Sequence, residues 1–151
     1  MKTEEAFTQR SRSLGYMLRS PYQRLSKALY GSLAARGFGD IRPSHSAVLR
    51  HIGPDGNRVT ELAEQAEITK QSMAYLVDSL EKLGYVKLEP DPDDGRAKLA
   101  RLTAKGDRML GALLETSNKL EAQVAQAFGP DFMKNLREEL QQLDAFLESV
   151  S

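Results

Sequence analysis

Cysteine is absent from this chain of 151 residues, and histidine occurs only twice. Without thiols the chain can form neither a disulfide framework nor a thiolate metal site, and two histidines offer little for a metal centre. We therefore expect no bound metal and no cofactor. The sequence also lacks the roughly 20 consecutive apolar residues of a membrane span and any apolar signal core in MKTEEAFTQRSRS, so we expect a cytoplasmic protein without membrane association.

The usual signs of an enzyme are missing too. No nucleophile stands at a recognisable spacing from a base, and the glycine-containing stretches GFG and GPDG lack the flanking strand and helix of a phosphate-binding loop. We expect no catalytic activity.

Net charge is also lacking, because 21 basic and 21 acidic side chains cancel. Their distribution is uneven: residues 1–50 carry nine Lys or Arg and three Asp or Glu. This asymmetry indicates either an oriented surface or ordinary solvated helix faces, and the sequence leaves both open.

Apolar residues at helical spacing fill most of the chain. They predict helices over residues 13–36, where Pro21 would kink or divide the helix, from Pro43 to the breaker at Gly53, and over residues 103–128 and 131–150. Residues 58–86 predict two helices separated by about three residues, which is the spacing of a helix-turn-helix. Thr60 and Thr69 are the predicted N-caps of this pair, and Gly84 is its C-terminal stop.

After Gly84 the period changes to alternation. Residues 85–89 and 98–102 predict two strands around the turn PDPDDG, and hence a β-hairpin. A helix-turn-helix followed by a hairpin is the layout of a winged helix, whose second helix enters the DNA major groove while the hairpin reaches the backbone or minor groove. The predicted fold is mainly α with a small β-hairpin wing.

These motifs carry a family resemblance. The segment VTELAEQAEITKQSMAYLVDSLEKLGYV, followed by DPDDGRAKLARLTAKG, resembles the DNA-binding core of the MarR family of bacterial transcriptional regulators. Asp94 and Arg96 match the family's D-x-R wing signature. Leu102, Thr103 and Gly106 match the LT-x-x-G that opens the following helix.

The resemblance implies one MarR-like domain over residues 1–151. Within it, residues 37–103 would form a winged helix-turn-helix lobe, and residues 1–36 and 104–151 a helical dimerisation lobe. It further implies an obligate homodimer that reads a pseudo-palindromic operator in double-stranded DNA. The apolar flanking helices agree with a dimer, although an intramolecular bundle could bury the same residues.

The second helix of the motif would read bases. With Met73, Val77 and Leu80 turned inward, its N-terminal residues face out, where Gln71 can address adenine and Lys70 guanine or a phosphate. The predicted major-groove contacts are Lys70, Gln71, Ser72 and Tyr75. Thr60, Thr69, Arg42 and Ser44 are predicted contacts to the DNA backbone, with caps and solvated polar residues as the alternative.

The wing would place Arg96 in a narrow minor groove, and Asp94 would accept a hydrogen bond from its guanidinium and hold it there. A purely structural turn, with Arg96 paired only to Asp94, is the alternative. The remaining acidic residues of the turn are expected to point along its outer side, away from DNA. The predicted wing contacts are Arg96, Asp94, Lys98 and Lys87.

Two positions depart from the family. Glu67 stands at the tight turn, where the family prefers Gly or Asn, and a left-handed conformation there would strain it by about 1 kcal/mol. Lys87-Leu88-Glu89 replaces a strand on which many relatives carry arginine, which leaves Lys87 and Lys98 as substitutes for a second wing contact.

Many members of the family bind a small aromatic or phenolic effector between their lobes. The candidate lining residues here are Tyr16, Arg19, Tyr22, Tyr30, Phe38 and His45. The alternatives are core or interface aromatics and, for His45, a position in the cap region or beside a DNA phosphate. The predicted function is a homodimeric sequence-specific DNA-binding regulator, a repressor released by such a ligand. The alternative is a winged-helix module for protein–protein interaction without specific DNA binding.

Overall fold

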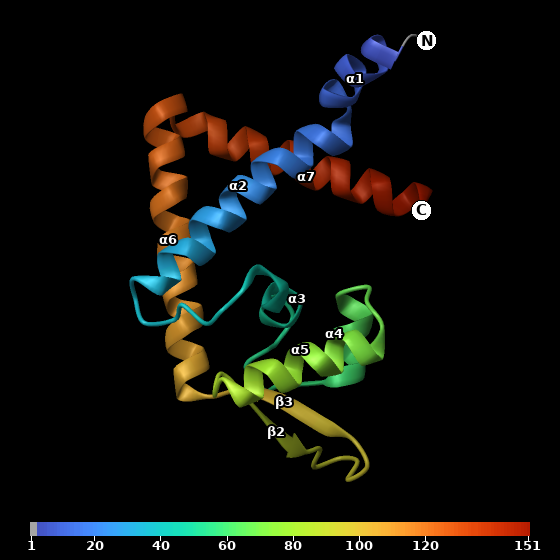
Figure 1. Ribbon diagram of the computed structural model, residues 1–151, viewed down its shortest axis with the longest axis vertical. Coiled ribbons are helices and arrows are strands. Elements are labelled where there is room, and N and C mark those ends of the chain that lie inside the picture. The colour runs from blue at the N-terminus through green and yellow to red at the C-terminus, as the bar shows by residue number, and fades with distance from the viewer. Residues whose placement is uncertain (1–2) are drawn as a thin grey trace. The chain divides into compact units, whose positions relative to one another are not determined.

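The computed structural model describes residues 3–151, and their side chains from Thr8 onward. Met1 and Lys2, which the predicted domain includes, lie outside the described residues. The chain divides into two compact units, Met1–Leu113 and Leu114–Ser151. The elements are α1 (Thr3–Arg12), α2 (Leu14–Ala34), the 3-10 turn η1 (Pro43–His45), α3 (Ser46–Leu49), β1 (Asn57–Arg58), α4 (Val59–Gln65), α5 (Lys70–Lys82), β2 (Val86–Pro90), β3 (Lys98–Leu102), α6 (Ala104–Phe128) and α7 (Pro130–Val150) (Figure 1).

The predicted fold class is confirmed: the chain is mainly helical with one small antiparallel sheet. No helix within residues 3–151 is long and apolar enough to cross a membrane.

Helix α2 runs without a break through Pro21 and begins after Ser13, whose side chain accepts a hydrogen bond from the Tyr16 N–H. A division of the helix at Pro21 is therefore wrong. Proline removes only one backbone donor, and the leucine and arginine residues on both sides of Pro21 favour helix strongly enough to continue it.

The helix-turn-helix consists of α4 and α5, as predicted. The N-cap of α5 is confirmed, because Thr69 Oγ1 accepts a hydrogen bond from the Ser72 N–H. The N-cap of α4 was predicted wrongly: Arg58, not Thr60, precedes the helix, and the Glu61 carboxylate accepts the Arg58 N–H at 3.2 Å. The chain enters α4 directly from strand β1, so Thr60 already lies inside the helix.

Helix α5 ends as its glycine predicts. Gly84 has φ +80°, which side chains with a Cβ rarely adopt, and the N–H groups of Gly84 and Tyr85 bond back to the Glu81 and Leu80 carbonyls. The chain then turns directly into strand β2.

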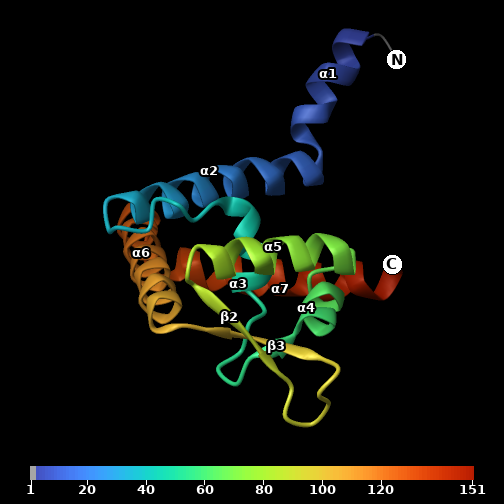
Figure 2. The ribbon, with the colours of Figure 1, turned by 60° about the horizontal axis from the view of Figure 1, so that its bottom comes forward.

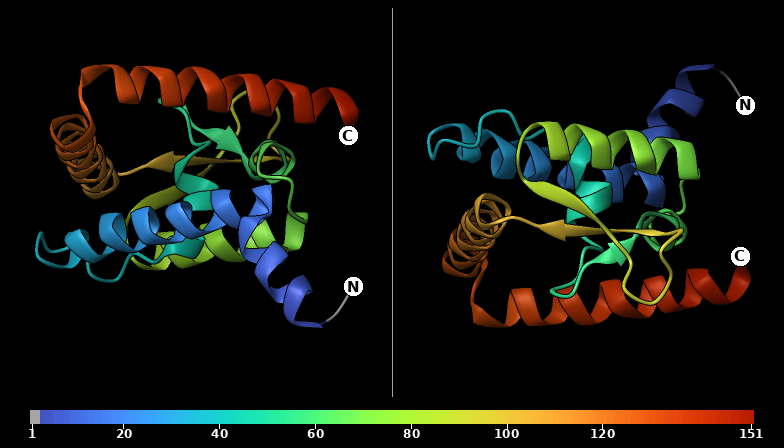
Figure 3. Two further views of the ribbon diagram at one scale, coloured as in Figure 1. Left: turned by 90° about the horizontal axis from the view of Figure 1, so that it is seen from above. Right: turned by 90° about the horizontal axis from the view of Figure 1, so that it is seen from below.

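The predicted hairpin is confirmed, and a third strand joins it. Strands β2 and β3 pair antiparallel in a register that places Val86 opposite Leu102 and Pro90 opposite Lys98. Strand β1 pairs with the other edge of β3, with Arg58 opposite Leu99, so the strand order is β1-β3-β2. Figure 2 shows the hairpin extending from the helical part, and Figure 3 (right) shows β3 between its two neighbours.

The core of the first unit lies among α2, α3, α4, α5, the sheet and the start of α6. The inward face predicted for α5 is confirmed, because Met73, Val77 and Leu80 are fully buried. They pack with the buried residues Leu33, Val48, Leu62, Tyr85, Val86 and Met109. This core holds α5 with its opposite face in solvent.

The second unit is built from the C-terminal part of α6 and α7. The rings of Phe128 and Phe132 stack with centroids 4.8 Å apart, and Arg137 pairs with Glu121. Helix α7 has no buried residue in the single chain. Its exposed large apolar side chains are Phe132, Leu136, Leu140, Phe146, Leu147 and Val150.

Candidate nucleic-acid interface

The N-terminal half of α5 presents a polar face to solvent. Lys70, Gln71 and Ser72 are exposed, and Tyr75 is 73% exposed one turn further on. Neither Lys70 nor Gln71 uses its side chain in a hydrogen bond or ion pair with any residue in the described part of the chain. Two of the four predicted major-groove residues are thus unengaged and exposed at the start of this helix.

The neighbouring hydroxyl groups of Thr69 and Ser72, in contrast, bond to each other. Thr69 Oγ1 donates to Ser72 Oγ at 2.8 Å while it accepts the Ser72 N–H at 3.1 Å. Both side chains are exposed. The pair therefore caps the helix first, and the capped N-terminus directs its remaining backbone N–H groups outward, which is an arrangement that suits a phosphate.

The wing loop, residues 91–97, carries its arginine at an exposed position. The backbone N–H of Arg96 donates to Asp94 Oδ1 at 3.1 Å, as in a local turn closed by an aspartate. Within residues 3–151 no hydrogen bond or ion pair is recorded for the Arg96 guanidinium. The predicted side-chain bond from Arg96 to Asp94 is therefore wrong: Asp94 accepts the backbone N–H of Arg96 and so shapes the loop.

Two acidic residues of the hairpin, Asp91 and Glu89, are paired with cations of the same lobe. Asp91, which was expected to point outward, is only 5% exposed, and its Oδ2 lies 2.5 Å from Arg58 Nε. The Asp93 N–H and then the Arg58 guanidinium lower the pKa of the Asp91 carboxyl. Glu89 pairs with Lys87 at 2.5 Å and with Arg101 at 3.1 Å.

The two wing lysines differ in whether an ion pair already engages their charge. Lys87 is bound to Glu89, which lowers the pKa of that carboxyl, so its charge is already balanced. Lys98 opens strand β3 opposite Pro90, is exposed, and has no ion pair among the residues that the structure describes. Lys98 is therefore the more available cation beside Arg96.

The predicted backbone contacts lie at two places. Arg42 and Ser44 are exposed in the segment before α3 and line a cavity of about 510 Å³ together with Tyr75 and Lys82 of α5. Thr60 is exposed on α4. The structure thus brings Arg42 and Ser44 beside α5, whereas Thr60 belongs to the preceding helix.

His45 borders the same cavity but is 3% exposed. Its Nδ1 accepts the Arg42 N–H at 3.1 Å and its Nε2 lies 3.1 Å from Ser79 Oγ on α5. Because Nδ1 accepts a proton donor, the neutral ring carries its own proton on Nε2 and donates it to Ser79. Burial, followed by the nearby Arg42 charge, lowers the pKa of His45. The cap position considered for His45 is confirmed.

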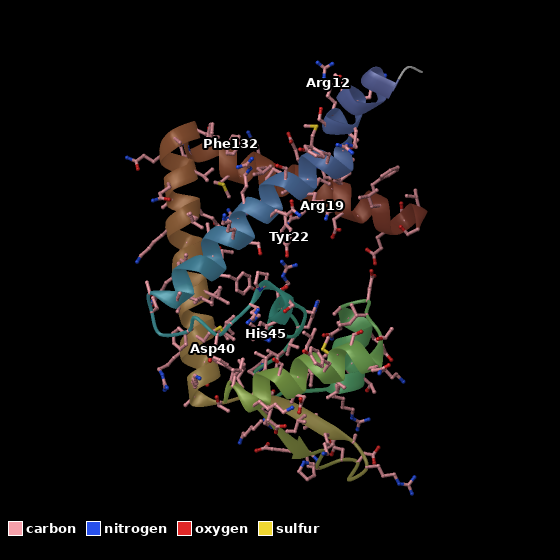
Figure 4. All side chains as sticks on the ribbon, viewed as in Figure 1. Arg12, Arg19, Tyr22, Asp40, His45 and Phe132 are labelled. Carbon is pink, nitrogen blue, oxygen red and sulfur yellow. The ribbon has the colours of Figure 1, made fainter. Side chains whose placement is uncertain are left out.

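Four of the six predicted effector residues, Tyr16, Arg19, Tyr22 and Tyr30, lie on α2. Tyr16 and Arg19 line a second cavity of about 360 Å³, shared with Arg10, Ser20 and Gln23. The Tyr22 hydroxyl accepts a hydrogen bond of 2.6 Å from Arg50, at the end of α3. Figure 4 labels Arg19 and Tyr22 on this helix.

Tyr30 lies near the C-terminal end of α2, and Phe38 and His45 lie in the segment that follows this helix. Tyr30 is half-buried; burial raises its pKa while a hydrogen bond with Ser46 lowers it. Phe38 packs against Tyr85 with ring centroids 6.2 Å apart. His45 follows α2 on the segment that Figure 4 marks with Asp40 and His45. The structure distributes the six residues over several places.

Arg58 was missed by the sequence reading. It joins β1 to α4 and pairs with Asp91, 33 positions away. Strand β1 has two residues, too few for an alternating pattern, and a single arginine before a helix is no signal of an ion pair. Only the acidic excess of the turn PDPDDG indicated that a cation was needed nearby.

Known proteins match the region that contains the helix-turn-helix and the wing loop. A model of the MarR family matches residues 40–97. The transcriptional regulator HosA of Escherichia coli O111:H- is 31% identical over 83 residues, which are 54% of this chain and 62% of HosA. The chain spans 60% to 66% of the length of the curated relatives it matches.

Solved structures extend the likeness to most of the chain. A probable transcriptional regulator from Pseudomonas aeruginosa aligns with a TM-score of 0.69 at 26% identity, over 87% of this chain and 96% of that one. The repressor CouR, solved bound to a 23-mer DNA duplex, aligns with a TM-score of 0.70 at 22% identity, over 95% and 98%. The predicted resemblance is confirmed: residues 40–97, which contain the helix-turn-helix and the D-x-R motif, match the MarR family, and the fold of most of the chain is that of solved transcriptional regulators.

Proposed function

We propose that this protein is a sequence-specific DNA-binding transcriptional regulator. The main support is that Lys70 and Gln71 on α5 and Arg96 on the wing loop are all exposed. Their side chains form no hydrogen bond or ion pair with the residues that the structure describes. Amide and ammonium groups at the start of a recognition helix read the major groove, and an exposed wing arginine fits a narrow minor groove. CouR, a repressor of the same fold, was solved on duplex DNA.

The regulator would act as a homodimer. Helix α7 exposes six large apolar side chains, and α2 exposes Leu14, Met17, Tyr22 and Leu25. Residues this apolar need a partner surface, and a second copy of the chain supplies one by symmetry. Residues 1–36 and 104–151 would then form the dimerisation lobe, and residues 37–103 of each copy would read one half of a pseudo-palindromic operator.

The regulator would be a repressor that a small aromatic or phenolic ligand releases from DNA. Support comes from the resemblance to the MarR family and from the cavity of about 360 Å³ that Tyr16 and Arg19 both line. An arginine and an aromatic side chain at one cavity suit an aromatic acid or phenolate.

Fluorescence anisotropy tests the proposal. DNA from upstream of the protein's own gene is compared with a scrambled duplex of equal length at several salt concentrations. A specific regulator binds its operator about 10³-fold or more tightly than random DNA, and binding weakens steeply with salt. Equal and weak binding to every genomic fragment tested would contradict the proposal and favour a winged helix that binds another protein.

A further inference from the structure

One ion pair joins the wing to the helix-turn-helix. Asp91 Oδ2 lies 2.5 Å from Arg58 Nε, and the Asp91 side chain is 5% exposed against 36% for Arg58. Arg58 is the residue from which α4 begins, and Asp91 is the first residue after strand β2. The contact therefore spans the two parts that the proposed function assigns to different DNA grooves.

Asp91 also organises the wing loop from within. Its Oδ1 accepts the Asp93 N–H at 2.9 Å, its own N–H donates to the Ala97 carbonyl at 3.0 Å, and its carbonyl accepts the Asp94 N–H. Both ends of the loop thus converge on Asp91. Residues 92–96 of this loop, Arg96 among them, are all exposed.

Arg58 is anchored on the opposite side. It pairs with Leu99 in the sheet, and its N–H donates to Glu61 of α4 at 3.2 Å. In the part of the chain that the structure describes, no other recorded hydrogen bond or ion pair joins residues 91–97 to α4 or α5. Strand β2 is bonded to α5 where the Leu88 N–H donates to Glu81 at 2.9 Å, and the loop beyond the strand is joined to the start of α4 through the Arg58–Asp91 pair.

We infer that Arg58 and Asp91 are positioning residues, which set where Arg96 meets the DNA relative to α5. The inference rests on the proposed DNA-binding function. An exposed loop that is free to move must be ordered when it binds, whereas a loop already held in place loses less entropy. The pair fixes the spacing between the minor-groove contact of the wing and the major-groove contacts of α5.

The substitution Asp91→Asn separates positioning from simple electrostatics. It removes a negative charge and releases Arg58, so general attraction to DNA predicts tighter binding. Positioning predicts the opposite: operator binding weakens on the order of tenfold because Arg96 is no longer held. The matched control is Asp93→Asn, which makes the same chemical change in the same loop at an exposed side chain. It should leave binding unchanged or slightly tighter.

Two measurements complete the test. Operator affinity is measured for Asp91→Asn in the natural chain and in Arg96→Ala; the tenfold loss should fall below about twofold in Arg96→Ala, because the pair acts through that arginine. Trypsin cleavage after Arg96 in the DNA-free protein should accelerate in Asp91→Asn and not in Asp93→Asn. Circular dichroism confirms that each variant is folded.

The outcomes are distinct. Natural protein that prefers its operator, with Asp91→Asn equal to Asp93→Asn in both affinity and cleavage, overturns the positioning role and leaves the DNA-binding function standing. An Asp91→Asn loss that persists undiminished in Arg96→Ala also overturns it. Natural protein without any preference for an operator overturns both proposals.

Discussion

Gly106 lies so close to the backbone carbonyl oxygen of Tyr85 that a Cβ at position 106 would overlap it. The contact closes the junction between β3 and α6. Thr103 completes it: its N–H donates to the same Tyr85 carbonyl at 3.0 Å, and its hydroxyl donates to the Gly84 carbonyl and accepts the Gly106 N–H. The LT-x-x-G motif is thus a packing device that holds the start of α6 against the end of α5.

Gly106→Ala should destabilise the protein by about 2 kcal/mol or more, because backbone must move to admit the methyl group. Gly111→Ala is the matched control on the same helix, where a Cβ would meet nothing within 4 Å. It should stabilise the helix by about 0.5–1 kcal/mol through reduced chain entropy. Urea denaturation at one protein concentration measures both, and equal effects of the two substitutions would contradict the packing role.

Glu67 has φ +54° at the turn between α4 and α5, as its position in the motif predicts. A side chain with a Cβ is strained in this conformation by about 1 kcal/mol, and glycine is not. Glu67→Gly should therefore raise the free energy of unfolding by about 0.5–1 kcal/mol. Glu67→Ala removes the charge but keeps the Cβ, so it should show no comparable gain. A gain of the same size in Glu67→Ala would assign the effect to charge and not to the backbone.

Acid should destabilise the protein through His45. Burial lowers its pKa below the ordinary value of 6.5, so between these two values the unfolded chain binds more protons than the folded chain. The contribution of His45 is full above pH 6.5 and is lost as the pH falls below it. Denaturant midpoints measured from pH 8 to pH 5 should fall with acid.

The control for this pH dependence is a substitution that keeps the Nδ1 contact. In His45→Asn the amide oxygen can still accept the Arg42 N–H without titrating, so the fall between pH 6.5 and pH 5 should be smaller. An undiminished slope in His45→Asn would show that other groups govern the response to acid.

Sequence periodicity predicted the long helices and the hairpin because each spans enough residues to repeat its pattern. It missed β1, which has two residues, and therefore misplaced the N-cap of α4 at Thr60. Asp94 was given the wrong partner since a D-x-R spacing does not say whether the aspartate meets the guanidinium or the backbone N–H of Arg96.

The candidate site shows the same limit. The exposed side of α5 follows from its buried face, so Lys70 and Gln71 could be chosen from the sequence. The pair of Arg58 and Asp91 could not, because it joins positions 33 apart in the chain and neither local pattern refers to the other.

Base reading by α5 is testable at Gln71. Its amide can bond the N6 and N7 edge of adenine in both directions, whereas alanine cannot distinguish bases in this way. Gln71→Ala should lower affinity for the operator more than for random DNA, with a loss of specificity of about 1–3 kcal/mol. Gln142→Ala, at an exposed glutamine of α7, is the matched control. Equal losses on both duplexes would contradict a base-reading role.

The wing contact is testable at Arg96. Its exposed guanidinium has no recorded partner among the residues described, so its removal should leave the folded protein and its oligomeric state unchanged. Operator binding in Arg96→Ala should weaken by about 1–3 kcal/mol because the contact between the guanidinium and the DNA is lost. Arg108→Ala removes an exposed arginine from α6 and controls for net charge. If folded Arg96→Ala binds the operator as tightly as Arg108→Ala, the wing arginine does not touch DNA. If both weaken together on every duplex, net charge alone explains the loss.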